Sequence, residues 1–236
     1  MKTFFKSLHR KVMLSGFLGL LIGAVMAQDC ETYYPTSEGA LLELTNYNRK
    51  DKVSGRTVQK ITNVSETSNG LTMDMEIEMY DDKDEFISKS DVSMRCEEGV
   101  FYLDMEQFLS PETMEAYKEM DVTVTSEDLP VPSELAVGKK LDDGSVTVKI
   151  ANEGMQIMTM TTTIKNREVV GQEKVTTPAG SFDCYKIAYD IETATIVKIN
   201  MKGIDWYAKG VGTVKSESYN KNDKLLGYSV LTKFEK

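Results

Sequence analysis

The side chains that most often carry out chemistry in proteins are scarce in this chain of 236 residues. It has one histidine, His9, and three cysteines. A Ser/His/Asp triad, a Cys/His pair, a His-ligated zinc and a two-His iron site all require an imidazole. Because His9 lies in a segment that we expect to be removed, the sequence predicts no catalytic residue, no metal site and no cofactor.

The first 27 residues have the composition of a signal peptide. Four basic residues and no acidic residue accompany an apolar run from Val12 to Val25, and small residues end the segment at Ala27. The run is shorter than the about 20 apolar residues that span a bilayer. We therefore expect a signal peptide at 1–27, export to the periplasm or beyond, and no integral span after cleavage. An uncleaved anchor is the alternative.

Charge argues against two classes of partner. The chain has 28 Lys and Arg against 37 Asp and Glu, a net charge of -9, and loss of the four basic leader residues makes this -13. Nucleic acids and anionic lipid surfaces attract proteins through clustered Lys and Arg. Neither is expected to bind, and the acidic surplus is explained by solubility. Peripheral association with the envelope through other contacts stays open, and the oligomeric state is not indicated.

Three cysteines, Cys30, Cys96 and Cys184, would remain after cleavage. An oxidising compartment favours one disulfide, and three pairings are possible. We prefer Cys30 with Cys96, which ties the new N-terminus to a strand and leaves Cys184 as a small buried thiol. A lipid anchor on Cys30 is disfavoured because Gln28 and Asp29 precede it where a lipoprotein signal has small residues.

Apolar residues recur along the chain with a period of two. Leu71, Met73, Met75, Ile77 and Met79 alternate with polar residues, so an extended chain places them on one face. This is typical of a half-buried strand in an antiparallel sheet. Further strands are predicted at 146–150, 158–164, 186–190, 195–201, 212–219 and 225–234.

Three similar segments predict hairpin turns. Tyr47–Val53 and Tyr219–Leu225 share an aromatic residue, a polar tip and an apolar restart, with Gly55 and Gly227 two positions later. Tyr80–Phe86 is a looser copy. Asn and Asp tolerate the left-handed backbone that short hairpin loops use. A calcium loop at the third copy is disfavoured, because it has no turn glycine and no carboxylate at the last ligand position.

One short helix is predicted from Pro111 to about Met120. Ser110 is a suitable N-cap, and Pro111 fits the first helical position. The segment 128–144 contains Pro130, Pro132 and Gly138 and is expected to be an irregular crossover. Because neither half obviously supplies its own core, we expect one β-rich domain at 28–236: a curved antiparallel sheet or half-barrel meander.

Two motifs resemble a known family. Thr176–Asp183 is similar to a TPAGTF-type turn, and Trp206–Glu217 is similar to a strand of the form W/Y-x-A-x-G-V-G-x-V-x-x-E. Both are found in exported bacterial proteins of unknown function, the DUF3108-like (TapB-like) family. The resemblance runs from about Cys30 to the C-terminus. It implies a shape similar to the half-barrels of periplasmic lipoprotein carriers, and it transfers no catalytic residue.

These observations favour a binding protein over an enzyme. A bent sheet offers a concave apolar face, and methionines would make that face adaptable. The candidate ligand-facing residues are Met73, Met75, Met158, Met160 and Trp206, although ordinary core packing explains each of them as well. We predict a non-catalytic carrier for an apolar ligand or a lipoprotein or other envelope partner. The alternatives are a structural envelope protein and, less favoured, a carboxylate-dependent enzyme such as a glycosidase.

Overall fold

The computed structural model describes residues 30, 33–109 and 111–236, so the signal peptide expected at 1–27 lies outside the described residues. Within this part, fourteen strands form one antiparallel sheet that curves into a nearly closed barrel, which confirms the predicted mainly β fold. The strands are β1 (Leu41–Asn48), β2 (Val53–Thr67), β3 (Gly70–Tyr80), β4 (Phe86–Glu97), β5 (Val100–Leu103), β6 (Asp121–Glu127), β7 (Leu129–Pro132), β8 (Lys140–Leu141), β9 (Gly144–Asn152), β10 (Met155–Thr177), β11 (Gly180–Ala194), β12 (Lys198–Ala208), β13 (Gly212–Asn220) and β14 (Leu225–Glu235).

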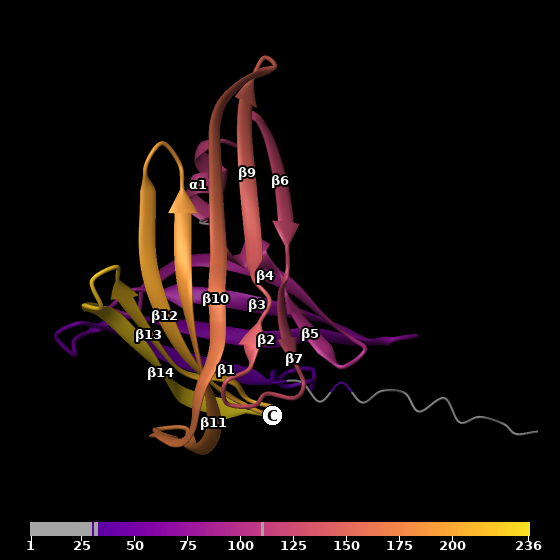
Figure 1. The fold of residues 1–236 in the computed structure, drawn as a ribbon, viewed down its shortest axis with the longest axis vertical. Helices are drawn as coiled ribbons and strands as arrows, with labels where there is room; N and C mark the ends of the chain where they lie inside the picture. Colours follow the sequence, from indigo (N-terminus) through magenta and orange to yellow (C-terminus); the bar gives the residue numbers. More distant parts are fainter. Residues whose placement is uncertain (1–29, 31–32, 110) are drawn as a thin grey trace, which may run out of the picture.

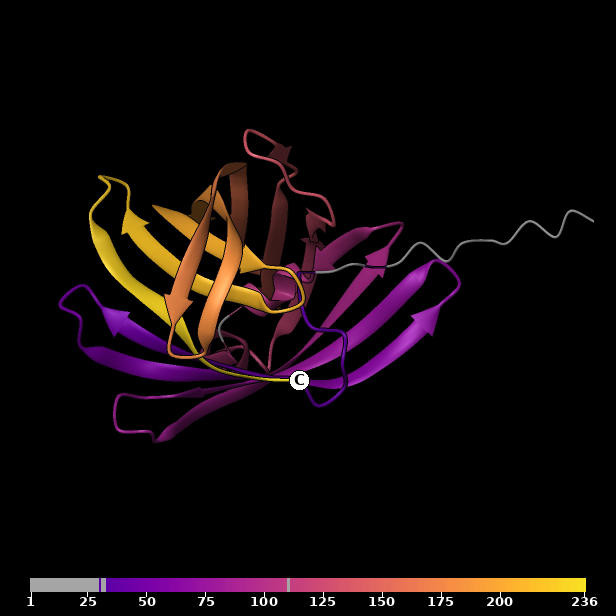
Figure 2. The ribbon, with the colours of Figure 1, turned by 90° about the horizontal axis from the view of Figure 1, so that it is seen from below.

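The order of the strands explains how the sheet nearly closes. It runs β6-β9-β10-β11-β12-β13-β14-β1-β2-β3-β4-β5-β7 (Figure 1). The short strand β8 pairs with β10. One stretch of chain, from Asp121 to Pro132, therefore supplies both margins: β6 pairs with β9 and β7 pairs with β5. Figure 2 shows the resulting curvature, with β1–β4 on one side and the later strands turned across them.

The period-two stripe behaves as predicted along most of β3. Met73 and Met75 are almost fully buried, whereas Met79 near the end of the strand is 43% exposed. The strand predicted at 195–201 begins later than expected. Residues 195–197 form the bend between β11 and β12, where the Thr195 N–H bonds to the carbonyl of Val197, and β12 starts at Lys198.

The three predicted hairpin turns share one geometry. In each, a side-chain oxygen of the first tip residue, Asn48, Asp81 or Asn220, accepts two backbone N–H groups of the loop. Asp51, Asp84 and Asp223 then adopt positive φ. A Cβ on Gly55 would lie 2.5 Å from the Tyr80 carbonyl oxygen, and one on Gly227 would lie 2.7 Å from that of Tyr47. These glycines let each hairpin pack against the next.

Two expected elements differ in the structure. The helix α1 covers Pro111–Ala116 rather than continuing to Met120, because Tyr117 and Met120 bond three residues back in successive turns. A short 3-10 helix, η1 (Met105–Phe108), precedes it. The segment 128–144 is less irregular than expected, since it holds β7 and β8. Proline is tolerated in β7 because this strand lies at a margin of the sheet.

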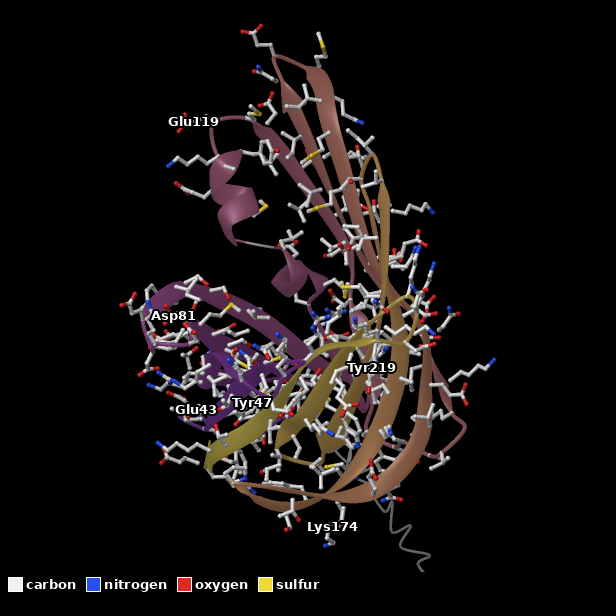
Figure 3. All side chains as sticks on the ribbon, turned by 90° about the vertical axis from the view of Figure 1, so that its left-hand side faces the viewer. Glu43, Tyr47, Asp81, Glu119, Lys174 and Tyr219 are labelled. Carbon is white, nitrogen blue, oxygen red and sulfur yellow. A yellow bond between two sulfur atoms is a disulfide. The ribbon has the colours of Figure 1, made fainter. Side chains whose placement is uncertain are left out.

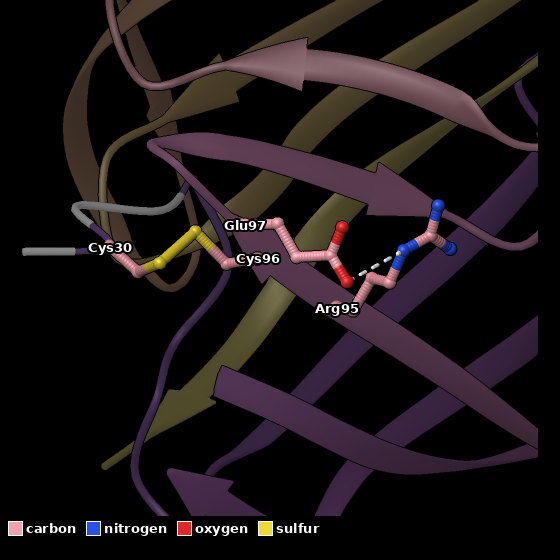
Figure 4. Close-up of a disulfide and its surroundings, with 4 residues drawn as sticks. All are labelled: Cys30, Arg95, Cys96 and Glu97. Carbon is pink, nitrogen blue, oxygen red and sulfur yellow. Dashed lines mark ion pairs between the residues drawn. A yellow bond between two sulfur atoms is a disulfide. The ribbon is translucent and has the colours of Figure 1, made fainter. Parts of the chain in front are cut away.

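A disulfide joins Cys30 to Cys96 on β4 (Figure 4). Gly70 makes room for it, because a Cβ there would lie 3.1 Å from the Cys30 sulfur and would overlap the Cys96 carbonyl. The free thiol of Cys184 is buried, and burial raises its pKa to about 11. Buried side chains form two clusters: a large one inside the curved sheet, and a smaller one around Trp206, Leu42 and Cys184.

Candidate ligand-binding cavity

A cavity of about 260 Å³ lies inside the curved sheet, where β10–β13 face β1, β2, β5 and β7. Its wall combines apolar and polar side chains. Its apolar side chains are Leu44, Leu103, Leu129, Ile164 and Ile187. Its polar side chains are Tyr34, Asn46, Thr57, Gln59, Arg167, Tyr189, Asp205, Tyr207, Thr213, Ser216 and Ser229. We call the sheet face that carries Ile164, Ile187 and Asp205 the inner face.

Asp205 on β12 is the centre of the polar part. Asp205 is only 9% exposed, and burial raises the pKa of its carboxyl group above the ordinary value. Tyr189 donates a hydrogen bond of 3.0 Å to Oδ2, and Tyr207 donates one of 3.4 Å to the same atom. Ser216 on β13 pairs with Asp205 in the β12–β13 ladder, and hydrogen bonding by its side chain lowers the pKa of the carboxyl group. The other oxygen, Oδ1, is buried without a hydrogen-bond partner among the described residues.

Gly203 positions the ring of Tyr189. The two residues pair across β11 and β12, so the ring lies directly over the glycine. A Cβ on Gly203 would lie 2.3 Å from Cζ of Tyr189 and 2.6 Å from its hydroxyl oxygen. The glycine is needed here for close approach, and its φ is not one that excludes other residues. The absent side chain therefore permits the hydrogen bond from Tyr189 to Asp205.

Arg167 supplies a buried positive charge to the same cavity. It is 4% exposed, and burial lowers the pKa of its guanidinium. Its Nη1 donates to the carbonyl oxygens of Pro130 at 2.8 Å and Asp142 at 2.5 Å. The charge of Arg167 also acts on Asp205, whose pKa it lowers. The cavity thus contains one acidic and one basic side chain, which largely balance each other.

Tyr34 and Tyr207 complete the aromatic part of the wall. Tyr34 stacks on Phe101 at 5.2 Å between ring centroids and lies 6.3 Å from the ring of Tyr207. Burial raises the pKa of Tyr34 to about 12 and that of Tyr207 well above its usual value. These phenols therefore stay protonated near neutral pH and can act as hydrogen-bond donors. The rings around Asp205 pack in or against the main core.

An apolar inner face continues from the cavity along β9–β12. Ile164 pairs with Ile191, which pairs with Met201. Met160 and Met158 lie on the same face as Ile164 by strand alternation, opposite Val148 and Ile150 of β9. This face leads toward the end of the molecule that carries α1. Figure 3 shows that end at Glu119, just after α1, and the opposite end at Lys174, in the β10–β11 hairpin.

The structure places the five predicted ligand-facing residues in three different environments. Met73 and Met75 are sealed in the main core and do not line the cavity. Met158 and Met160 are half-buried on the inner face beyond it. Trp206 is 3% exposed on the opposite face of β12 from Asp205, and its indole N–H donates to Glu173 at 2.5 Å. Lys186 and Lys215 contact its ring.

The residues around Asp205 were not identified as candidates from the sequence. One signal was available: Asp205 falls in the inward-facing row of β12, between Gly203 and Tyr207, where the alternation predicts an apolar residue. Tyr207, Thr213 and Ser216 also lie within the Trp206–Glu217 motif. The remaining lining residues come from strands distant in sequence, and no local pattern joins them.

The described residues contain no group of three or more His, Cys, Asp or Glu side chains placed to hold a metal ion. No helix among them has the length and hydropathy that crossing a bilayer requires.

Comparison with known proteins assigns the family. The DUF3108-like family model matches residues 37–231, so the chain belongs to this family. A candidate lipoprotein from Parabacteroides distasonis is 28% identical, with a TM-score of 0.72, and the match covers 88% of this chain and 100% of that one. A candidate exported protein with a YmcC-like fold from Bacteroides fragilis is 26% identical, with a TM-score of 0.70 and the same coverage. No curated protein matches the chain.

Proposed function

We propose that this DUF3108-like protein is an exported, non-catalytic binding protein that holds a small amphipathic molecule inside its curved sheet. The polar end of the molecule lies beside Asp205, and its apolar part follows the inner face past Ile191 and Met160. The observation that carries this proposal is a buried polar cluster that lines a cavity, on a sheet face whose next residues, Ile191 and Met201, are apolar. Ligand sites usually combine mostly apolar walls with a few fixed polar groups.

The distribution of acids favours binding over hydrolysis. Asp205 is the one acidic residue among the described residues that line the cavity. A glycosidase of the usual kind needs two carboxyl groups on either side of the bond that it cleaves. The cavity instead pairs its acid with Arg167 and with tyrosine hydroxyls, which hold a ligand but supply no second acid.

Two observations support an extracytoplasmic site of action. Disulfides persist mainly in oxidising compartments, and this chain has one between Cys30 and Cys96. The similar proteins from Parabacteroides and Bacteroides are a candidate lipoprotein and a candidate exported protein. We therefore place the protein in the periplasm or outside the cell, with peripheral contact with the envelope as part of the same proposal.

The proposal is tested by filling the cavity. Thr57 lines it from β2, whereas the next residue, Val58, faces the other side of the strand. We expect eight-carbon amphiphiles to raise the melting temperature of the wild-type protein, because a ligand at about 100 times its Kd stabilises by about 2.7 kcal/mol. Thr57→Trp should abolish this shift, and Val58→Trp should retain it.

Native mass spectrometry of the same three proteins supplies the second measurement. Wild type and Val58→Trp should carry one amphiphile per chain, and Thr57→Trp should carry none. If no amphiphile shifts the melting temperature of any of the three proteins, the cavity is not a ligand site. An equal response of Thr57→Trp and Val58→Trp would place the site elsewhere.

A further inference from the structure

The unpartnered oxygen of Asp205 defines what the cavity can recognise. Tyr189 and Tyr207 both donate to Oδ2, so the protons of these two hydroxyl groups are already used. Oδ1 is buried and has no partner among the described residues. Leaving a buried acceptor unsatisfied is costly. A hydrogen-bond donor that enters the cavity, water in the free protein or a ligand group in the complex, would remove that cost.

The charges around the cavity restrict the kind of donor. A cationic head group would be attracted to Asp205 but repelled by Arg167. An anionic head group would be attracted to Arg167 but repelled by Asp205. Each would leave one buried charge without compensation, which is expensive in a low-dielectric interior. Arg167 is also already engaged, because its Nη1 donates to the carbonyls of Pro130 and Asp142. An uncharged donor leaves the balance between Asp205 and Arg167 unchanged.

The size of the cavity indicates how much of the ligand it encloses. Its volume of about 260 Å³ is a little below the usual range for sites that enclose a drug-sized ligand, about 300–1,000 Å³. It therefore fits a compact head group and the first carbons of a chain. The rest of the chain can extend along the inner face, where Ile191, Met201 and Met160 offer apolar contacts.

We propose that the head group of the bound molecule is uncharged and carries a hydroxyl that donates a hydrogen bond to Oδ1 of Asp205. The ligand class is thus a neutral amphiphile with a hydroxyl-bearing head, such as an alcohol or an acylglycerol. This inference rests on the proposed function, since it concerns the same cavity, and it adds the chemistry of the group that is recognised.

Four eight-carbon probes test it by isothermal titration calorimetry: octan-1-ol, heptyl methyl ether, octylamine and octanoate. The alcohol and the ether are isomers, and the ether oxygen accepts hydrogen bonds but cannot donate one. Wild-type protein should bind octan-1-ol about tenfold more tightly than the ether, since only the alcohol satisfies Oδ1. The two charged probes should bind more weakly than the alcohol.

Asp205→Asn then tests which group reads the hydroxyl. The two tyrosine donors hold the amide oxygen in the position of Oδ2, so the amide NH2 takes the position of Oδ1. That NH2 donates equally well to an alcohol or an ether oxygen, and the preference for octan-1-ol should fall to about one. Asp190→Asn is the matched control: Asp190 lies on β11, the neighbour of β12, but does not line the cavity, so its variant should keep the tenfold preference.

The outcomes separate this inference from the proposed function. If wild type binds octan-1-ol and the ether equally, or prefers a charged probe, the hydroxyl inference is wrong while the cavity remains a ligand site. If none of the four probes binds, both fail. An Asp205→Asn protein that binds and keeps the tenfold preference would also overturn the inference. The wild-type ratio is decisive by itself if Asp205→Asn does not fold, which circular dichroism would reveal.

Discussion

Strands β3 and β12 each bury a row of inward-facing residues, but they use these rows differently. On β3, the inward residues Met73 and Met75 are sealed by neighbours in the main core. On β12, the inward row contains Gly203, Asp205 and Tyr207, and it borders a cavity. Both rows are buried. Burial alone therefore does not distinguish a core from a ligand site, whereas a buried polar atom without a hydrogen-bond partner beside a cavity does.

The difference also divides stability from recognition. The β3 row stabilises the fold by excluding water from flexible apolar side chains. The β12 row lowers the stability of the fold, because it buries the carboxyl group of Asp205, whose pKa is raised by desolvation. Natural proteins retain such costs mainly at functional sites. Three predictions follow from this division, in order of decreasing effect.

Met75→Ala should lower stability without affecting recognition. Met75 is 1% exposed, and removing a buried side chain of this size costs about 2–5 kcal/mol of unfolding free energy. Urea unfolding measures this loss. Met79→Ala is the control, since Met79 lies on the same strand but is 43% exposed and should cost much less. A large change in octan-1-ol affinity in folded Met75→Ala would mean that the two rows are coupled.

Gly203→Ala should damage the β12 row specifically. Its Cβ would displace the ring of Tyr189, so the hydrogen bond to Asp205 is lost, at a cost of about 1.5–3 kcal/mol for a bond to a charged group. Urea unfolding should show that loss, and octan-1-ol should bind more weakly. Gly171→Ala is the matched control, because its Cβ would meet only the Lys186 Cβ at 4.0 Å. Equal effects of the two variants would contradict the role assigned to Gly203.

The pH dependence of Asp205 should have a definite sign. Its folded pKa is raised, so the carboxyl group favours folding while it is protonated in both states, below about pH 3.9. That contribution is lost as the pH rises through the folded pKa. Asp205→Asn does not titrate there, so its stability relative to wild type should increase from acid to neutral pH. Urea unfolding between about pH 3 and pH 7 measures the difference. A difference of the opposite slope would show that Asp205 is stabilised as an anion.

Much of the fold could be predicted because its determinants are local. The Tyr47 and Tyr219 hairpins were identified from polar tips of five residues, and the structure gives both the same hydrogen bonds. The alternation in β3 likewise specifies a strand and its buried face. The helix was predicted too long because tertiary contacts, not propensity, decide whether a short helix continues.

The cavity could not be predicted, since its walls come from residues far apart in sequence. Thr57, Arg167 and Asp205 meet only after the sheet has curved. Curvature depends on bulges and on close approaches such as Gly55 to Tyr80, whose combined effect no sequence pattern reports. Methionine composition directed attention to Met73 and Met75, because apolar residues are more conspicuous in a strand than one acid facing inward.

The pairing of β1 with β14 has a consequence for how the molecule assembles. Leu41 lies opposite Glu235, so the first strand of the sheet joins the last one to be synthesised. Until β14 is present, β1–β5 and β9–β13 are two separate sheets with no ladder between β13 and β1. Pairing two strands that are so far apart in the sequence slows folding, because a long loop must close first. The barrel interior, Asp205 included, therefore takes its final form only when β14 has paired with both β13 and β1.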